Sequence, residues 1–151
     1  MQTPSATHET PSARLVVCEK SGRWGAQLRR LLPSAGRWIS ETRSVSQWLD
    51  ALGDHPASLC AVEVTLANFD QVHATLARVG EEFPLVRTVV ASDELPVDAV
   101  WALREAGAIH AVNALRRLES IAPLWQRHAE QFPPRATTEI DRVLASLPWS
   151  K

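Results

Sequence analysis

The chain has 151 residues, an apolar fraction of 45%, a charged fraction of 22% and a formal net charge of −1. This length is typical of one domain with a single core, and the small net charge excludes a strong general attraction to nucleic acid or to an anionic membrane. No apolar run reaches the roughly 20 residues that a membrane-spanning helix needs. The two cysteines lie within apolar segments, which fits a reducing compartment, so we predict a cytoplasmic protein.

Residues 1–13 are mostly Thr, Ser, Pro and Ala, a composition that predicts a disordered N-terminal tail. From residue 14 to residue 132, apolar segments that predict strands alternate with amphipathic segments that predict helices. The predicted strands, in chain order, are Leu15–Cys18, Arg37–Thr42, Leu59–Val64, Val86–Val90 and Ile109–Val112. This alternation predicts one α/β domain.

The predicted helices begin and end at residues that favour helix boundaries. Ser44 followed by Gln47 resembles a capping box, Pro96 suits a helix start, and Gly107 suits a helix end. Four tryptophans fall at helical spacing beside leucines or valines, and we interpret them as packing residues: Trp24, Trp48, Trp101 and Trp125.

Five strand–helix rounds with right-handed crossovers place helices on both faces of a parallel sheet. Five strands fit the flavodoxin-like order 2-1-3-4-5, in which binding and chemistry occur at the carboxyl ends of the strands. After Pro133 and Pro134, the C-terminal tail of residues 133–151 contains a predicted short amphipathic helix, Thr138 to Leu147. This helix either packs on its own domain or binds a groove of a partner.

Four segments carry a resemblance to a known family: Leu15–Lys20, Leu59–Glu63, Val89–Ser92 and Gly107–Ala114. In these places the chain resembles the receiver domain of two-component response regulators. That family has, in the same order, a strand ending in an acidic pair, a strand ending in the phosphoacceptor aspartate, a strand ending in Ser or Thr, and a Gly-Ala opening followed by Lys-Pro. The resemblance covers about Arg14 to Gln131.

The reactive positions of the family are mostly changed in this chain. A divalent cation held by acidic oxygens, a lysine and a hydroxyl support phosphoryl transfer in that family. Glu63 stands at the phosphoacceptor position, and its extra methylene displaces the carboxylate by roughly an ångström, which can cost about 100-fold in rate. The corresponding residues here are Cys18, Glu19, Glu63, Ala91 or Ser92 for the hydroxyl, and Ala114 or Leu115 for the lysine.

The resemblance therefore implies a degenerate receiver, or pseudo-receiver: a non-enzymatic signalling module that is not phosphorylated and uses no metal or cofactor. We expect it to act through a protein partner, with a homodimer as one option, and to bind neither nucleic acid nor membrane. The resemblance implies a pairing face over Val97–Ala106, Ile109–Asn113 and Leu118–Gln131. Candidate contact residues are Trp101, Trp125, Leu147 and Trp149.

Two alternatives stay open at this point. Glu19 and Glu63 retain enough acidity for a residual metal or phosphoryl site, or the strand ends bind a small ligand as flavodoxin-like proteins do. The sequence also leaves open whether Glu63 mimics a phosphorylated residue or simply ends a strand in solvent.

Overall fold

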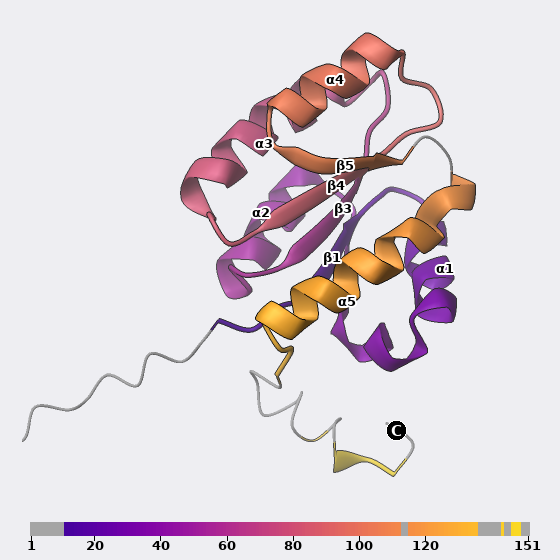
Figure 1. Cartoon of the computed structure of the whole chain (residues 1–151), viewed down its shortest axis with the longest axis vertical. Coiled ribbons are helices and arrows are strands. Elements are labelled where there is room, and N and C mark those ends of the chain that lie inside the picture. Colours follow the sequence, from indigo (N-terminus) through magenta and orange to yellow (C-terminus); the bar gives the residue numbers. More distant parts are fainter. Residues whose placement is uncertain (1–10, 113–114, 136–142, 144–145, 149–151) are drawn as a thin grey trace, which may run out of the picture.

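A computed structural model describes residues 11–112, 115–135, 143 and 146–148. Its centre is a parallel five-stranded sheet in the order β2-β1-β3-β4-β5 (Figure 1). The strands are β1 Leu15–Cys18, β2 Ile39–Thr42, β3 Leu59–Glu63, β4 Arg87–Ala91 and β5 Ala108–Val112. The strand order predicted from the sequence is confirmed.

Five α-helices cover the two faces of this sheet: α1 Arg23–Leu31, α2 Val45–Asp54, α3 Phe69–Glu82, α4 Val97–Glu105 and α5 Ile121–Gln131. Figure 1 shows α1 and α5 on one face and α2, α3 and α4 on the other. Each face has its own buried apolar cluster, one packed beneath each helical layer. The molecule is therefore a three-layer, flavodoxin-like α/β domain, as predicted.

The central strands consist of apolar residues because helices cover them on both faces. Every residue of β1 is buried, and Cys60 in β3 is completely buried. On the α2 side, Trp48 Nε1–H donates a hydrogen bond to Cys60 Sγ over 3.3 Å. Burial raises the pKa of the Cys60 thiol to about 12, so it stays protonated and acts as a core residue.

The start of α2 follows the capping signal in the sequence. Ser44 Oγ accepts a hydrogen bond from the Gln47 N–H over 3.2 Å, and Gln47 Oε1 accepts one from the Arg43 N–H over 2.8 Å. The first of these contacts satisfies a donor that the helix itself leaves free, and the second holds the residue before the cap. The end of β2 is thus fixed to the first turn of α2.

Two short 3-10 helices refine the predicted boundaries. The helix η1, Pro33–Trp38, follows α1, so β2 begins at Ile39 and not at Arg37 as predicted. The helix η2, Leu115–Ser120, precedes α5 and has a kink at Arg117. Its end agrees with the prediction that the regular part of the last helix starts near Ser120.

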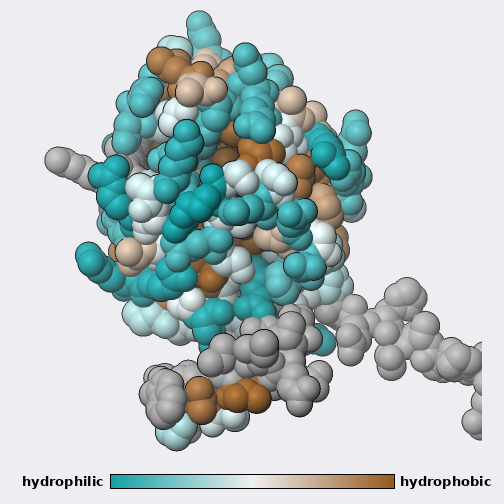
Figure 2. All heavy atoms as spheres, turned by 180° about the vertical axis from the view of Figure 1, so that it is seen from behind, coloured by the Kyte–Doolittle hydropathy of each residue, from teal (hydrophilic) through white to brown (hydrophobic). Residues whose placement is uncertain are grey.

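The interpretation of Trp101, in α4, as a packing residue is wrong. Leu103 is fully buried, but Val97 is 70% exposed and Trp101 is 60% exposed. Trp125, which the sequence offered both as a packing residue and as a candidate contact residue, is a packing residue and lies in the core with Ile121. The space-filling view from behind shows separate hydrophobic patches on a mostly hydrophilic surface (Figure 2).

The two ends of the domain differ from the predicted boundaries in one respect. Ser12 and Ala13 are already buried, so ordered packing begins before residue 14, while residues 1–10 lie outside the described part. Most of the helix predicted over Thr138 to Leu147, as well as Trp149, also lies outside it. Among the described residues, none of the helices has the length and hydropathy needed to cross a bilayer.

Candidate functional site

The carboxyl edge of the sheet brings together most of the residues that the sequence singled out. Cys18 ends β1 and Glu63 ends β3, on neighbouring strands. Ala91 ends β4 and pairs in register with Glu63, while Glu19 directly follows β1. Ala114 lies outside the described residues.

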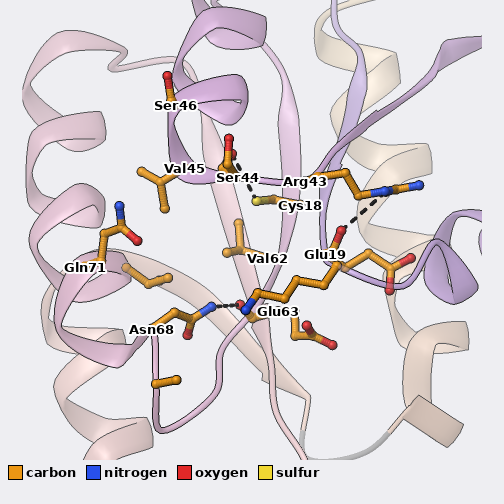
Figure 3. Close-up of a pocket in the computed structure, with 13 residues that line it drawn as sticks. Cys18, Glu19, Arg43, Ser44, Val45, Ser46, Val62, Glu63, Asn68 and Gln71 are labelled. Atoms are coloured by element: carbon orange, nitrogen blue, oxygen red, sulfur yellow. Dashed lines mark hydrogen bonds between the residues drawn. The ribbon is translucent and has the colours of Figure 1, made fainter.

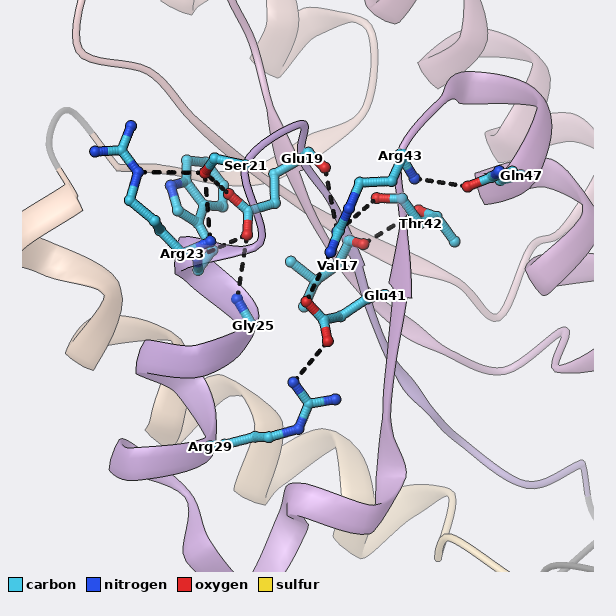
Figure 4. A network of polar contacts seen from close by, with 11 residues as sticks. Val17, Glu19, Ser21, Arg23, Gly25, Arg29, Glu41, Thr42, Arg43 and Gln47 are labelled. Carbon is cyan, nitrogen blue, oxygen red and sulfur yellow. Dashed lines mark hydrogen bonds and ion pairs between the residues drawn. The ribbon is translucent and has the colours of Figure 1, made fainter.

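Glu19 is 2% exposed, and its carboxylate is used to start α1 (Figure 4). Its Oε1 accepts hydrogen bonds from the Trp24 N–H over 2.7 Å and the Gly25 N–H over 3.3 Å, while Ser21 Oγ–H donates to Oε2 over 3.0 Å. A carboxylate at this position satisfies free helix donors and interacts favourably with the helix dipole. Both oxygens of the retained acid are therefore engaged within the protein.

The turn before α1 explains why Glu19 takes this role. Gly22 precedes the helix with a φ of 80°, and no side chain at that position caps the helix. Glycine adopts this left-handed conformation without a Cβ penalty, and the resulting turn leads the chain back under the Glu19 carboxylate. This cap was not predicted, although Glu19 shortly before Ser21-Gly22 at a helix start was a usable signal.

Cys18 lies beside Glu19 and is nearly buried. Its Sγ–H donates to the Ser44 carbonyl oxygen over 3.6 Å. Burial is the main cause that raises the pKa of the Cys18 thiol, although a hydrogen bond with Thr42 opposes the shift. At neutral pH this position therefore offers a protonated thiol and not a charged oxygen.

Glu63 has different surroundings from Glu19. Glu63 is half-buried, and its backbone oxygen accepts a hydrogen bond from Asn68 Nδ2 over 3.0 Å. Asn68 Oδ1 in turn accepts the Thr65 N–H over 2.7 Å, which fixes the loop into α3. In the described part of the chain, the Glu63 carboxylate itself makes no hydrogen bond or ion pair.

The register of β4 decides between the two candidates for the hydroxyl position. Ala91, which has no hydroxyl, is the residue opposite Glu63. Ser92 lies one residue beyond the strand, where its N–H donates to the Val112 oxygen over 3.0 Å and its Oγ accepts the Glu94 N–H over 3.2 Å. The Ser92 hydroxyl is thus engaged in the loop that leads to α4.

A pocket of about 330 Å³ opens beside these strand ends, between the starts of α2 and α3 (Figure 3). Cys18 and Val62 come from the strands, Val45 from α2, and Gln71 and Val72 from α3. Lys20, Arg43 and Glu63 also line it. The sequence predicted the strand-end residues, but the contributions of α2 and α3 depend on how the helices pack.

The residues present do not fit the divalent cation that the receiver resemblance implies. Both Glu19 oxygens are engaged, and the Cys18 thiol is protonated, which leaves Glu63 as the one acid with free oxygens among the three. Hard cations such as Mg²⁺ require several oxygen ligands. Over residues 11–112 and 115–135, no three His, Cys, Asp or Glu side chains form a group that could hold a metal ion.

A second polar network ties the edge strand β2 to α1 (Figure 4). Glu41 forms ion pairs with Arg29, at 2.7 Å, and with Arg43, at 3.2 Å. The hydrogen bond from Arg29 is the main cause that lowers the pKa of Glu41. Arg43 also donates to the Glu19 backbone oxygen over 3.3 Å, so this network braces the turn that holds Glu19.

No protein-family model matches the sequence, and no curated protein matches it. Solved structures do match. A response regulator from Thermotoga maritima has a TM-score of 0.67 at 17% identity, over 79% of this chain and 98% of that chain. The chain has the fold of a receiver domain. A CheY-like protein, tadZ, from Pseudomonas aeruginosa has a TM-score of 0.60 at 21% identity, over 76% and 98% of the two chains.

A third receiver-fold structure is an atypical orphan response regulator, described as having a phosphorylation-independent regulatory mechanism. Its TM-score is 0.65 at 16% identity, over 81% of this chain and 99% of that chain. At these identities the comparisons establish the receiver fold alone. The role of this receiver-like domain therefore has to be argued from its own site.

Proposed function

We propose that this receiver-like domain is a signalling module that works without phosphorylation and acts by contact with a protein partner. The observation that carries the proposal is the engagement of Glu19. The one acid left at the family's acidic pair has both oxygens bonded to the start of α1. A cation that drew this carboxylate away would leave helix donors unsatisfied in a buried place.

The other positions support the same conclusion. Cys18 supplies a neutral thiol where an acid is expected, and Ala91 stands opposite Glu63 with no hydroxyl. Phosphoryl transfer is catalysed almost entirely by positioning and by charge stabilisation, so it depends on these groups together. Receiver domains are in general non-enzymatic modules that phosphorylation regulates. In this chain, the residues that usually support that phosphorylation are replaced.

The exposed part of α4 and β5 is the partner surface that we propose. Val97 and Trp101 on α4 and Ile109 on β5 are large apolar side chains that reach solvent. Arg104 lies over the Trp101 ring, 5.8 Å from its centroid. Tryptophan and arginine are enriched among residues that dominate interface energies, which favours a protein partner for this face.

Phosphorylation is tested by incubating the intact chain with acetyl phosphate and Mg²⁺ and measuring its mass. We expect no mass gain on a time scale that fully modifies a competent receiver used as a positive control. A Mg²⁺ titration followed by tryptophan fluorescence tests the cation, because Trp24 lies next to Glu19, to which its backbone N–H donates. A stable phosphoryl adduct on Glu63, or saturable Mg²⁺ quenching that Glu19→Gln abolishes, would overturn the proposal.

The partner surface is tested with Trp101→Ala against a matched control, Leu66→Ala. Both side chains are large, apolar and more than half exposed, but Leu66 lies in the loop before α3. We expect Trp101→Ala to weaken capture of the partner, or self-association if the partner is a second copy, at least tenfold. An equal effect of the two substitutions would show that this face is not the contact.

The strand-end pocket favours a second candidate function, binding of a small ligand. Its volume lies at the lower end of the range typical of ligand sites, and its valine floor with a polar rim has the usual composition of such sites. A thermal-shift screen with nucleotides and flavins, repeated on Val62→Trp to fill the pocket, separates this candidate from the first. A shift that the filled variant loses would favour ligand binding.

A further inference from the structure

A second groove lies at the opposite edge of the sheet, between η1 and the end of α5. Its volume is about 340 Å³. The apolar part of its lining consists of Leu32, Ala35, Trp38, Trp125 and Ala129. This groove lies away from the carboxyl ends of the strands, because η1 follows α1 and leads into the start of β2.

The walls of this groove are fixed before anything binds. Arg14 and Arg37 lie over the Trp38 ring at 5.0 and 4.6 Å from its centroid, which holds the indole in place. The end of α5 is anchored where His128 Nε2–H donates to the Ala57 oxygen. Burial lowers the pKa of His128, so the imidazole is neutral and keeps this bond at neutral pH.

The chain leaves the domain at the mouth of the groove. Pro134 is itself one of the lining residues, and the chain continues from there to Lys151. The following sequence places four apolar residues at the spacing of one helical face: Ile140, Val143, Leu144 and Leu147. The charged residue Arg142 falls on the opposite side of such a helix, and Asp141 falls on its flank.

We propose that the segment Thr138 to Leu147 binds the Trp38–Trp125 groove of its own chain through this apolar face. Val143 is 55% exposed in the structure, so its side chain is available for such a contact. Residues 135–137, which link Pro134 to this segment, can span up to about 11 Å when extended, and a helix over Thr138 to Leu147 would be about 15 Å long. The tether therefore reaches the groove without strain.

The tether also decides the strength of binding. A short linker gives a local concentration of about 1 mM, so an intrinsic dissociation constant of about 100 µM leaves the groove roughly tenfold more often occupied than empty. This inference stands independently of whether the domain is phosphorylated.

A disulfide-trapping experiment on the full-length chain tests the proposal. Ala129→Cys in the groove is combined with Val143→Cys on the apolar face or, as the matched control, with Ala145→Cys on the opposite face of the predicted helix. The native thiols do not interfere because both are buried. We expect the Val143 pair to form an intramolecular disulfide in a mild glutathione buffer at least tenfold more than the Ala145 pair.

Three results would overturn the proposal: equal trapping of the two pairs, no trapping of either, or a disulfide-linked dimer as the main product. The last would identify a second copy as the occupant. A second measurement uses the side-chain N–H resonances of Trp38 and Trp125 in the full-length chain. Leu144→Asp should shift the Trp38 signal, while Arg142→Asp should leave it unchanged, and the reverse pattern would contradict the assignment.

Discussion

Glu19 and Glu63 follow neighbouring strands at the same edge of the sheet, yet their carboxylates serve different ends. Glu19 is buried and accepts three hydrogen bonds, which start α1. Glu63 is half-exposed beside a pocket, and within the described residues its carboxylate has no bonding partner. The comparison teaches that a residue kept in a family position can be committed to stability, while its neighbour stays available for contact.

The largest effect should come from Glu19→Ala. The substitution removes the acceptor of the Trp24 and Gly25 N–H groups, and hydrogen bonds to a charged group contribute about 1.5–3 kcal/mol each. We expect a loss of about 2–3 kcal/mol in the free energy of unfolding, measured by urea denaturation. Glu19→Gln keeps one oxygen acceptor and should lose less. A loss below about 0.5 kcal/mol would contradict the capping role.

A smaller loss should follow from Gly25→Ala. Alanine favours a helix interior by about 1 kcal/mol over glycine, but a Cβ here would collide with the Glu41 carboxylate and displace it from Arg29 and Arg43. We expect a net loss of no more than about 0.5 kcal/mol in the free energy of unfolding, because displacing the partly exposed Glu41 side chain costs little more than the helix gains from alanine.

Gly80→Ala is the matched control for this substitution. Gly80 also lies within a helix, α3, but a Cβ there meets no atom within 4 Å. It should stabilise the protein by up to about 1 kcal/mol. Thermal or urea unfolding of both variants should therefore give opposite signs, and two stabilised variants would show that Glu41 moves aside freely.

The Glu41 network should give a similarly small effect that depends on pH. Arg29 and Arg43 lower the pKa of Glu41 in the folded state below its unfolded value of about 4.3. The stabilisation is therefore complete above that value and is lost as the pH falls through the lowered pKa. At pH 6 the free energy of unfolding of the wild type, measured by urea denaturation, should exceed that of Glu41→Gln by less than about 1 kcal/mol. This difference should shrink below about pH 4; a constant difference would exclude the ionic origin.

The smallest effect should come from Glu63→Ala. No bond of its carboxylate within the described residues would be lost, so the free energy of unfolding should change by less than about 0.5 kcal/mol. The same urea experiment as for Glu19→Ala measures it. A loss above 1 kcal/mol would remove the contrast between the two glutamates.

The fold could be predicted because its signals are local and repeated. Strands such as Leu15–Cys18 are continuous apolar runs, and cap residues such as Ser44 separate them from helices. The 3-10 helix over Pro33–Trp38 was missed because six residues in this conformation give no 3.6-residue period. Periodicity also placed Trp101 inside, since a pattern of apolar residues does not say whether core or solvent faces it.

For the site, the sequence predicted which positions lie at the strand ends but not which contacts their side chains make. The predicted strand order, which the structure confirms, places β1 beside β3 and therefore the positions of Cys18 and Glu63 at one edge. The role of Glu19 depends on the backbone conformation of Gly22 and on donors in the next helix, which no spacing rule contains. The choice between Ala91 and Ser92 likewise needed the register between two strands that are distant in sequence.

The two buried thiols allow local opening of the folded chain to be measured by chemical modification. A reagent reaches Cys60 only when the core beneath Trp48 separates, whereas Cys18 becomes accessible when Ser44 and the first turn of α2 move away from it. Under native conditions, the alkylation rate of Cys18 therefore reports a local opening at α2, and the alkylation rate of Cys60 reports a larger opening of the core. A binding partner that closes the strand-end pocket would slow the alkylation of Cys18 and leave the alkylation rate of Cys60 unchanged.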